Sequence, residues 1–279
     1  MKVITSNFHT HTDFCDGKDR PEAIVLQAIE GGMTDLGFSG HAYTPCDLSY
    51  AMTRETAEKY RQEIRRLQSE YSHRINILCG LEMDYFSEQD TSQFDYTIGS
   101  VHYVFCKNGE YCPVDEAPEI TEKAIERAYG GDPYGLVEDY FRQEGDVVRK
   151  TGCAFIGHFD LLTKFQERKK LFDESHPRYI AAWQSALDQL IPHGVPFEIN
   201  TGAISRGYRT SPYPSMDILK EIARRGGKIV FSSDAHEKDT LRYGFAEAVR
   251  LAREAGFSTH WVLEKNGMKE EPLENLYLI

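Results

Sequence analysis

The sequence predicts an α/β fold in which a parallel sheet closes into a barrel. Segments typical of strands alternate about seven times with segments typical of helices, the pattern of parallel strands joined by helical crossovers. The histidines and carboxylates suited to chemistry lie at or just past the C-terminal ends of the predicted strands. Barrels collect their active sites at that end, whereas an open doubly wound sheet uses mainly one switch point. A chain of 279 residues suits one barrel, so we expect residues 1–279 to form a single domain.

The composition disfavours several classes of protein. Hydrophobic residues make up 41% of the chain, which is ample for a core, and the net charge is −12. A chain this acidic is a poor general binder of nucleic acid but is compatible with a site for several divalent cations. There is no basic segment followed by an apolar run at the N-terminus, and no stretch is apolar enough to span a membrane. The six cysteines form no CxxC motif, so we expect a cytoplasmic protein with reduced thiols. Because no stretch is apolar enough to span a membrane, we expect no membrane partner.

Proline and glycine mark the first elements. The apolar opening run 3–8 predicts a strand. Pro21 opens a helix at the position where its missing N–H costs nothing, and Gly31-Gly32 ends that helix. Residues 35–39 are then typical of a short strand, with Gly40-His41 at its C-terminal end.

A long amphipathic helix is predicted over residues 53–72, because apolar residues recur there with the spacing of one buried stripe. The stripe consists of Ala57, Tyr60, Ile64, Leu67 and Tyr71. Strands are predicted next over 75–79 and 95–99. Residues 106–118 then form an excursion with a turn at Asn108-Gly109, a dipeptide typical of tight hairpins.

The second half of the chain continues the alternation of helix and strand. Periodic apolar patterns predict helices over 133–150, 177–191, 214–225 and 239–255. Strands are predicted over 154–156, 195–199 and 228–231. The C-terminal segment 261–273 is typical of a hairpin around Asn266-Gly267. The sequence contains no evident linker, internal repeat or low-complexity tract.

The strongest chemical signal follows the first predicted strand. His9 and His11 are one residue apart, and alternate residues of a strand point to the same face, so the two imidazoles project together. Asp16 lies in the loop that follows. An HxH motif alone is short enough to occur on an ordinary surface strand, so the case for a metal depends on distant partners.

Nine oxygen and nitrogen donors, drawn from the ends of several strands, form the predicted metal site. They are His9, His11, Asp16, His41, Glu82, His102, His158, Asp234 and His236. The set is too large for one tetrahedral ion and suits two or three divalent ions bridged by carboxylate. Imidazole with carboxylate favours zinc, manganese or iron over calcium, and the lack of grouped thiolates disfavours an iron–sulfur cluster. Singly, each residue has an ordinary alternative, such as a core histidine, a solvated Glu82 or Asp234 as a helix N-cap.

Short motifs along nearly the whole chain resemble those of the PHP (polymerase and histidinol phosphatase) superfamily. They are His9-Thr10-His11, Asp16-Gly17, Gly40-His41, Gly80-Leu81-Glu82-Met83-Asp84-Tyr85, Gly99-Ser100-Val101-His102, Gly157-His158 and Ser233-Asp234-Ala235-His236. Glu82-Met83-Asp84-Tyr85, Gly99-Ser100-Val101-His102 and Glu198-Ile199-Asn200-Thr201 are most similar to the histidinol-phosphate phosphatase branch. One departure is Gly40, where many PHP proteins have Asp, and we expect altered tuning of the site there, not loss of metal.

The resemblance implies a distorted seven-stranded (β/α)7 barrel, similar to a TIM barrel, with a trinuclear metal site at the C-terminal end of the strands. Carried over residue by residue, it implies one ion held by His9, His11, Glu82 and Asp234. A second ion would take Asp16, His41 and His236. A third would take Glu82, His102 and His158, with Glu82 as the bridge.

Such a site suits hydrolysis of a phosphate monoester, a reaction that is extremely slow unaided. Clustered divalent ions neutralise the phosphoryl oxygens, generate hydroxide at neutral pH and orient it for in-line attack. Glu82, Asp234 and His236 are the expected catalytic residues, with Asp234 or a metal-linked histidine near the leaving oxygen. By resemblance, the substrate is L-histidinol phosphate and the reaction belongs to histidine biosynthesis.

A phosphate site should also carry a cation from the protein. Arg206 and Arg209 follow the strand predicted over 195–199, so either could fork onto phosphate oxygens at the active face. Lys164 is a weaker candidate, and an exposed loop position is the ordinary alternative for each arginine. From charge alone, we also expect an acidic wall for the ammonium group of the substrate, supplied by Asp84 or Asp160.

Other functions stay open at this point. A PHP phosphoesterase acting on another small phosphate ester or a nucleotide would use the same chemistry, and tyrosine-rich loops would suit a base. A metal-stabilised barrel that binds a partner without turnover is disfavoured, because every expected ligand position is filled. A carbon–nitrogen hydrolase on a similar barrel fits the motif order less well. The expected partner is a small-molecule phosphate ester, and the sequence sets no expectation for the oligomeric state.

Overall fold

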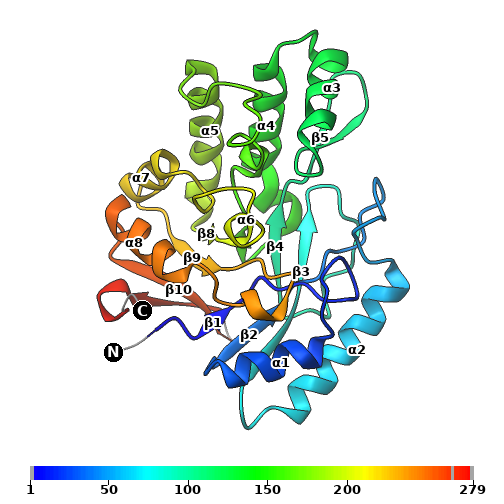
Figure 1. The fold of residues 1–279 in the computed structure, drawn as a ribbon, viewed down its shortest axis with the longest axis vertical. Coiled ribbons are helices and arrows are strands. Elements are labelled where there is room, and N and C mark those ends of the chain that lie inside the picture. The colour runs from blue at the N-terminus through cyan, green and yellow to red at the C-terminus, as the bar shows by residue number, and fades with distance from the viewer. Residues whose placement is uncertain (1–2, 265–266, 277–279) are drawn as a thin grey trace.

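The computed structural model describes residues 3–264 and 267–276 and contains a nearly closed barrel of parallel strands surrounded by helices (Figure 1). The barrel strands are β1 (Ser6–Asn7), β2 (Asp35–Phe38), β3 (Asn76–Asp84), β4 (Tyr96–Ser100), β7 (Phe155–Ile156), β8 (Phe197–Asn200) and β9 (Ile229–Ser232). They lie in this order in one sheet, and each neighbouring pair is parallel. The predicted α/β barrel is therefore confirmed.

Backbone pairing joins the two edges of this sheet. Thr10 forms a parallel bridge with Ala235, and the backbone N–H of His11 donates to the carbonyl of Ala235 over 2.8 Å. Nearby, the Asn7 side-chain amide donates to the Ser233 hydroxyl over 2.9 Å. Thr10 and Ala235 are each flanked on both sides by predicted metal ligands, so the barrel closes at the predicted site.

Helices connect the strands, and most of them lie outside the barrel (Figure 1). They are α1 (Pro21–Glu30), α2 (Arg54–Glu70), α3 (Pro118–Tyr129), α4 (Pro133–Thr151), α5 (Pro177–Leu190), α6 (Gly202–Ser205), α7 (Met216–Arg224) and α8 (Phe245–Ala255), with 3-10 turns η1 (Leu161–Thr163), η2 (Ile191–His193), η3 (Lys238–Thr240) and η4 (Leu273–Asn275). Capping defines their ends: the Thr53 hydroxyl accepts from the Thr56 N–H over 3.1 Å before α2. Within residues 3–264 and 267–276, no helix has the length and apolarity needed to cross a membrane.

Helix α2 shows how an apolar stripe positions the site. Its buried residues are Ala57, Tyr60, Ile64 and Leu67, as predicted. Tyr71 instead lies just after the helix and is half-buried. Its hydroxyl donates to Glu22 Oε1 over 2.9 Å. The Tyr60 hydroxyl donates to the carbonyl of Gly80 over 2.9 Å. The helix is thereby tied to β3, the strand that carries Glu82.

The segment between β4 and α4 differs from the prediction. The excursion predicted over 106–118 is a hairpin of β5 (Tyr103–Phe105) and β6 (Tyr111–Pro113). Helix α3 follows the hairpin and was not predicted, because it buries only Thr121 and Ile125 and so has a weak apolar stripe. It packs on α4 and on the β5–β6 hairpin. The later helix predicted over 239–255 begins only at Phe245, since Gly244 takes φ 73° before it.

Strand β3 is longer than predicted, whereas the C-terminal hairpin agrees with the prediction. Strand β3 continues to Asp84, beyond its predicted end at Cys79, so Glu82 lies within the strand. Near the C-terminus, β10 (Thr259–Glu264) pairs antiparallel with β11 (Gly267–Pro272) beside β9. This confirms the predicted hairpin, and Asn266 lies outside the described residues.

Candidate metal centre

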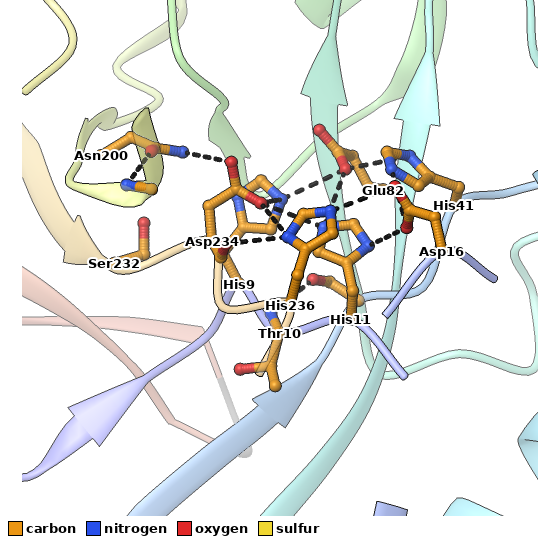
Figure 2. A network of polar contacts seen from close by, with 12 residues as sticks. His9, Thr10, His11, Asp16, His41, Glu82, Asn200, Ser232, Asp234 and His236 are labelled. Carbon is orange, nitrogen blue, oxygen red and sulfur yellow. Dashed lines mark hydrogen bonds and ion pairs between the residues drawn. The ribbon is translucent and has the colours of Figure 1, made fainter. Parts of the chain in front are cut away.

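The nine predicted donors converge at the C-terminal ends of the barrel strands. Figure 2 labels these donors except His102 and His158. His9 and His11 flank the Thr10 bridge, both are fully buried, and their ring centres lie 5.1 Å apart. Strand β1 ends at Asn7, earlier than predicted. The two imidazoles still project together, because pairing with Ala235 keeps the backbone aligned beyond the strand.

Glu82 is the centre of the cluster and is only 1% exposed. Imidazole nitrogens lie within 3.4 Å of its carboxylate oxygens from His9, His11, His41, His102 and His158. The shortest of these nitrogen–oxygen distances, 2.9 Å, joins Glu82 Oε1 to His158 Nε2. The Ser100 hydroxyl donates to the same oxygen over 2.7 Å. A carboxylate with imidazoles on both oxygens has the geometry of a bridge between ions.

Asp234 and Asp16 supply the other carboxylates. Asp234 follows β9 at φ 48°, the left-handed region that Asp tolerates better than most residues. Its Oδ1 lies 3.2 Å from His11 Nε2 and 3.5 Å from His236 Nδ1. Asp16 Oδ1 lies 3.5 Å from both His11 Nδ1 and His41 Nε2. Asp16 Oδ2 lies 3.1 Å from His236 Nε2, so the two carboxylates enclose His236.

The donors fall into overlapping groups in which the ligand atoms lie within 4.8 Å of one another. These groups are His11-Asp16-His41-His236, His9-His11-Asp234, His9-Glu82-His158 and His41-Glu82-His102. The buried Nε2 atoms of His9 and His11 and the Oε2 atom of Glu82 make no hydrogen bond within the described residues. Buried polar atoms normally have a partner, so this donor set fits divalent ions.

Charge and burial set protonation states that suit metal binding at two of the donors, Glu82 and His11. Burial by itself disfavours the Glu82 carboxylate, but the imidazoles of His9 and His41 outweigh it and hold the pKa of Glu82 well below its usual range. Burial, reinforced by His236 and His41, lowers the pKa of His11 to about 3. Ionised carboxylate and neutral imidazole are the forms that bind metals, so these two residues need no deprotonation step.

Glu198 was not predicted as a site residue, yet it supports three ligands. It is fully buried in β8, and its Oε1 lies 2.6 Å from His9 Nδ1. Its Oε2 accepts from the backbone N–H of His158 over 2.8 Å and from the Asn200 amide over 2.8 Å. Asn200 also donates to Asp234 Oδ2 over 3.3 Å. A carboxylate on the far nitrogen of a ligand histidine fixes the ring and its tautomer. The available signal was a glutamate inside an otherwise apolar strand.

Arg206 lies against the cluster, as the sequence led us to expect. Its guanidinium donates to the Asp234 carbonyl over 2.9 Å and to Asp234 Oδ2 over 2.9 Å. It also lies 2.7 Å from His236 Nδ1. With 26% of its side chain exposed, Arg206 lines the cavity, while its two terminal nitrogens contact Asp234 and His236.

Arg209 and Lys164 take different positions. Arg209 does not line the cavity: its guanidinium stacks 4.7 Å over the Tyr213 ring and donates to the Thr163 hydroxyl. It therefore joins two loops below the surface. Lys164 does line the cavity, but its Nζ donates to the Asp115 carbonyl over 2.7 Å and lies 3.2 Å from Asp115 Oδ2.

A cavity of about 270 Å³ opens over the donors. Beyond the cluster, its walls carry aromatic and acidic side chains, namely Tyr50, Tyr103, Tyr208, Asp47, Asp115 and Glu116. Asp84 and Asp160, the acidic residues considered from the sequence, do not line it. Asp84 Oδ2 accepts from the His102 N–H over 2.8 Å, and Asp160 Oδ2 accepts from the Ser215 N–H over 3.0 Å. The structure thus places other acidic residues on the cavity wall, and not these two.

Comparison with known proteins agrees with this geometry. The PHP domain model matches residues 7–202. The chain is 30% identical to the probable histidinol-phosphatase of Deinococcus radiodurans, over 90% of this chain and 94% of that protein. It is 28% identical to the probable histidinol-phosphatase of Schizosaccharomyces pombe, over 92% of this chain and 89% of that protein.

A solved structure shares the fold. The histidinol phosphate phosphatase of Lactococcus lactis, complexed with zinc, L-histidinol and phosphate, superposes with a TM-score of 0.70 at 20% identity. The match covers 96% of this chain and 100% of that one. From the matched domain model and these relatives, the chain belongs to the PHP domain family.

Proposed function

We propose that this protein is a metal-dependent phosphomonoesterase that hydrolyses L-histidinol phosphate to L-histidinol and phosphate in histidine biosynthesis. The proposal rests on one observation: His, Asp and Glu side chains that can bind divalent metals lie together with Arg206 at one cavity. The relatives that match nearly the whole chain are called histidinol-phosphatases, which supports the choice of substrate. Ligands come from residue 9 to residue 236, so we further propose that residues 1–279 act as one domain.

The donors would hold two to three divalent ions. The family resemblance assigns His9, His11, Glu82 and Asp234 to one ion, Asp16, His41 and His236 to a second, and Glu82, His102 and His158 to a third. In the structure His11 also joins the second group, and Glu82 groups with His158 beside His9 and with His102 beside His41. Zinc is the first choice because of the zinc in the Lactococcus lactis structure, with manganese and iron as alternatives for the same donors. Ions bound there neutralise phosphoryl oxygens and make hydroxide available near neutral pH.

The cavity suits a substrate with opposite charges at its two ends. Arg206 lies beside the donors, where a phosphate would sit, while Asp47, Asp115 and Glu116 line other parts of the wall. Histidinol phosphate carries a phosphate and an ammonium group, which match these two regions. Tyr50 and Tyr103 offer aromatic faces to an imidazole ring. A nucleoside monophosphate would also find aromatic faces, but it offers no ammonium group to Asp47, Asp115 and Glu116.

The test is phosphate release from L-histidinol phosphate beside a panel of nucleotides and sugar phosphates, using protein whose metals have been counted by elemental analysis. We expect strong preference for histidinol phosphate with two to three ions bound per chain. A deaminated analogue of histidinol phosphate should bind more weakly, since it offers no cation to the acidic wall. Preference for another ester at the same metal content would move the substrate, and full metal content without hydrolysis of any ester would refute the enzyme.

Replacing Arg206 and replacing Arg209 should have different effects on KM. Arg206→Gln is expected to raise KM about tenfold or more, because a hydrogen bond to a charged group contributes about 1.5–3 kcal/mol. Arg209→Gln should instead lower the melting temperature and leave KM unchanged, since it removes the stack on Tyr213. Steady-state kinetics, metal counting and thermal unfolding measure these effects, with Arg206→Lys as the charge-preserving control. An unchanged KM in Arg206→Gln with full metal content would remove Arg206 from the phosphate site.

A further inference from the structure

The hairpin β5–β6 carries two cysteines on one face. Val104 pairs with Cys112 in the hairpin register, and the Cys106 N–H donates to the carbonyl of Glu110 over 2.8 Å. Residues two apart on a strand point to the same side, so Cys106 and Cys112 occupy diagonal positions on one face. That face is the buried one: Cys106 is 2% exposed and Cys112 is 3% exposed. We call these two residues the thiol pair.

The contact between the two thiols favours a reactive sulfur. The side chains interact with each other, and both line a cavity of about 160 Å³ together with Glu110, Lys123 and Arg127. The lowered pKa of Cys106 comes mainly from the contact with Cys112, whereas Glu110 and Asp139 raise it, and the thiolate is the reactive form. The contact with Cys112 lowers the pKa of Cys106 and the same contact raises that of Cys112, so one sulfur of the pair gives up its proton more readily.

The other cysteines lie in the opposite kind of environment. Burial raises the pKa of Cys15, Cys79 and Cys153 to about 12 and that of Cys46 to about 11. Among the six cysteines, all of which the structure describes, only Cys106 has a lowered pKa and a second cysteine in contact. Selective chemistry at the thiol pair is therefore expected.

The hairpin is also a wall of the main cavity. Tyr103, Pro113 and Asp115 lie at its base and line that cavity. The backbone N–H of Val114 donates to the carbonyl of the predicted ligand His102 over 2.9 Å. The Tyr103 hydroxyl donates to Asp47 Oδ2 over 2.6 Å, across the cavity mouth. A change in the strand spacing of the hairpin would therefore be transmitted to the wall of the site.

We propose that the thiol pair is a redox modification site: Cys106 and Cys112 form a reversible disulfide with a peroxide as oxidant, and the bond alters the cavity wall. The Cys106 thiolate attacks one oxygen of hydrogen peroxide and the O–O bond breaks. The hydroxide that leaves takes up the proton released by the thiol, so a sulfenic acid and water form. The Cys112 sulfur then attacks the Cys106 sulfur, the S–O bond breaks, and a second water leaves. Two thiols are oxidised and one peroxide is reduced, and a dithiol reverses the change by exchange.

The geometry explains why the bond would move the hairpin. Diagonal neighbours in an antiparallel pair lie about 7–8 Å apart between Cα atoms. A disulfide usually spans about 4.4–6.8 Å between Cα atoms. Closing the bond therefore draws β5 and β6 together diagonally. Tyr103 and Asp115 shift with the strands that carry them, so we expect weaker binding of substrate in the oxidised protein.

The experiment treats the zinc-loaded protein with hydrogen peroxide, because zinc has no redox chemistry of its own. Thiol titration should show loss of two of the six thiols, and peptide mapping should show Cys106 joined to Cys112. KM for histidinol phosphate should rise several-fold and return after treatment with a dithiol. Cys106→Ser and Cys112→Ser should each abolish the cross-link and the rise in KM, while the control Cys46→Ser should retain both.

Two outcomes would overturn the proposal. Oxidation of other cysteines in preference to the thiol pair would refute the modification site. A complete Cys106–Cys112 cross-link with unchanged KM would refute its coupling to the cavity. The kinetic part rests on the proposed function, whereas thiol titration and peptide mapping do not. A protein that hydrolyses no ester therefore still gives a separate answer on the disulfide.

Discussion

Replacing Glu82 by Gln should nearly abolish both metal binding and phosphatase activity. Both oxygens of this carboxylate contact imidazoles, from several different strands. A glutamine keeps one acceptor oxygen, turns an N–H2 group toward the imidazoles and removes the negative charge. We expect kcat/KM to fall by more than about a thousandfold, beyond the 10–100-fold loss typical of residues that only support a ligand.

The measurement combines elemental analysis with steady-state kinetics. Glu88→Gln is the matched control, because Glu88 lies on the surface near Arg54 and away from the donors. Asp234→Asn and His236→Asn should also lose activity, as members of the proposed catalytic set that line the cavity. If Glu82→Gln kept full metal content and wild-type turnover, the cluster could not be the active centre.

The second large effect is expected at Glu198, which is fully buried and does not line the cavity over the donors. Its carboxylate holds His9 Nδ1, the backbone of His158 and the Asn200 amide at the same time. In Glu198→Gln one of these acceptor positions becomes a donor, so His9 loses its fixed tautomer or His158 loses its backbone support. We expect metal affinity to fall about 10–100-fold, as for other carboxylates behind ligand histidines.

A merely structural role would give a different pattern. If Glu198 positions ligands, activity of Glu198→Gln should recover when zinc is raised above the new dissociation constant, and the apparent melting temperature should rise with it. Ser232→Ala, which removes only one hydroxyl that donates to Glu198, should show a smaller change in the same direction. Wild-type zinc affinity in Glu198→Gln would rule out the positioning role.

The donors were accessible from the sequence because each lies in a short motif near the C-terminal end of a strand or in the loop that follows it, where barrel geometry brings it to the centre. His9 and His11 needed only the alternation of side chains along extended backbone. Glu198 was not accessible in that way. Its partners are residues 9, 158 and 232, and nothing in the local sequence relates it to them. Its function depends on the closed barrel.

The hairpin β5–β6 and the wall of the cavity show a second limit. Asp115 and Tyr103 line the cavity because the hairpin folds back on His102, an irregular excursion that periodicity does not describe. The same holds for the arginines: Arg206 and Arg209 follow the same strand, yet a turn of α6 and the loop after it send one to the cavity and the other to Tyr213. Side-chain direction in such segments is set by tertiary contacts.

The closure of the barrel between Thr10 and Ala235 has a consequence for how the protein folds during translation. A nascent chain that ends before Ile229 already carries every proposed ligand except Asp234 and His236. It lacks the strand that brings Asp234 and His236 to His11, and contacts this distant in sequence form slowly. The complete donor set therefore exists only once the last barrel strand has left the ribosome and docked. Binding of the full set of ions would then occur late in folding. It would join the donors near the N-terminus to Asp234 and His236, which follow the last barrel strand.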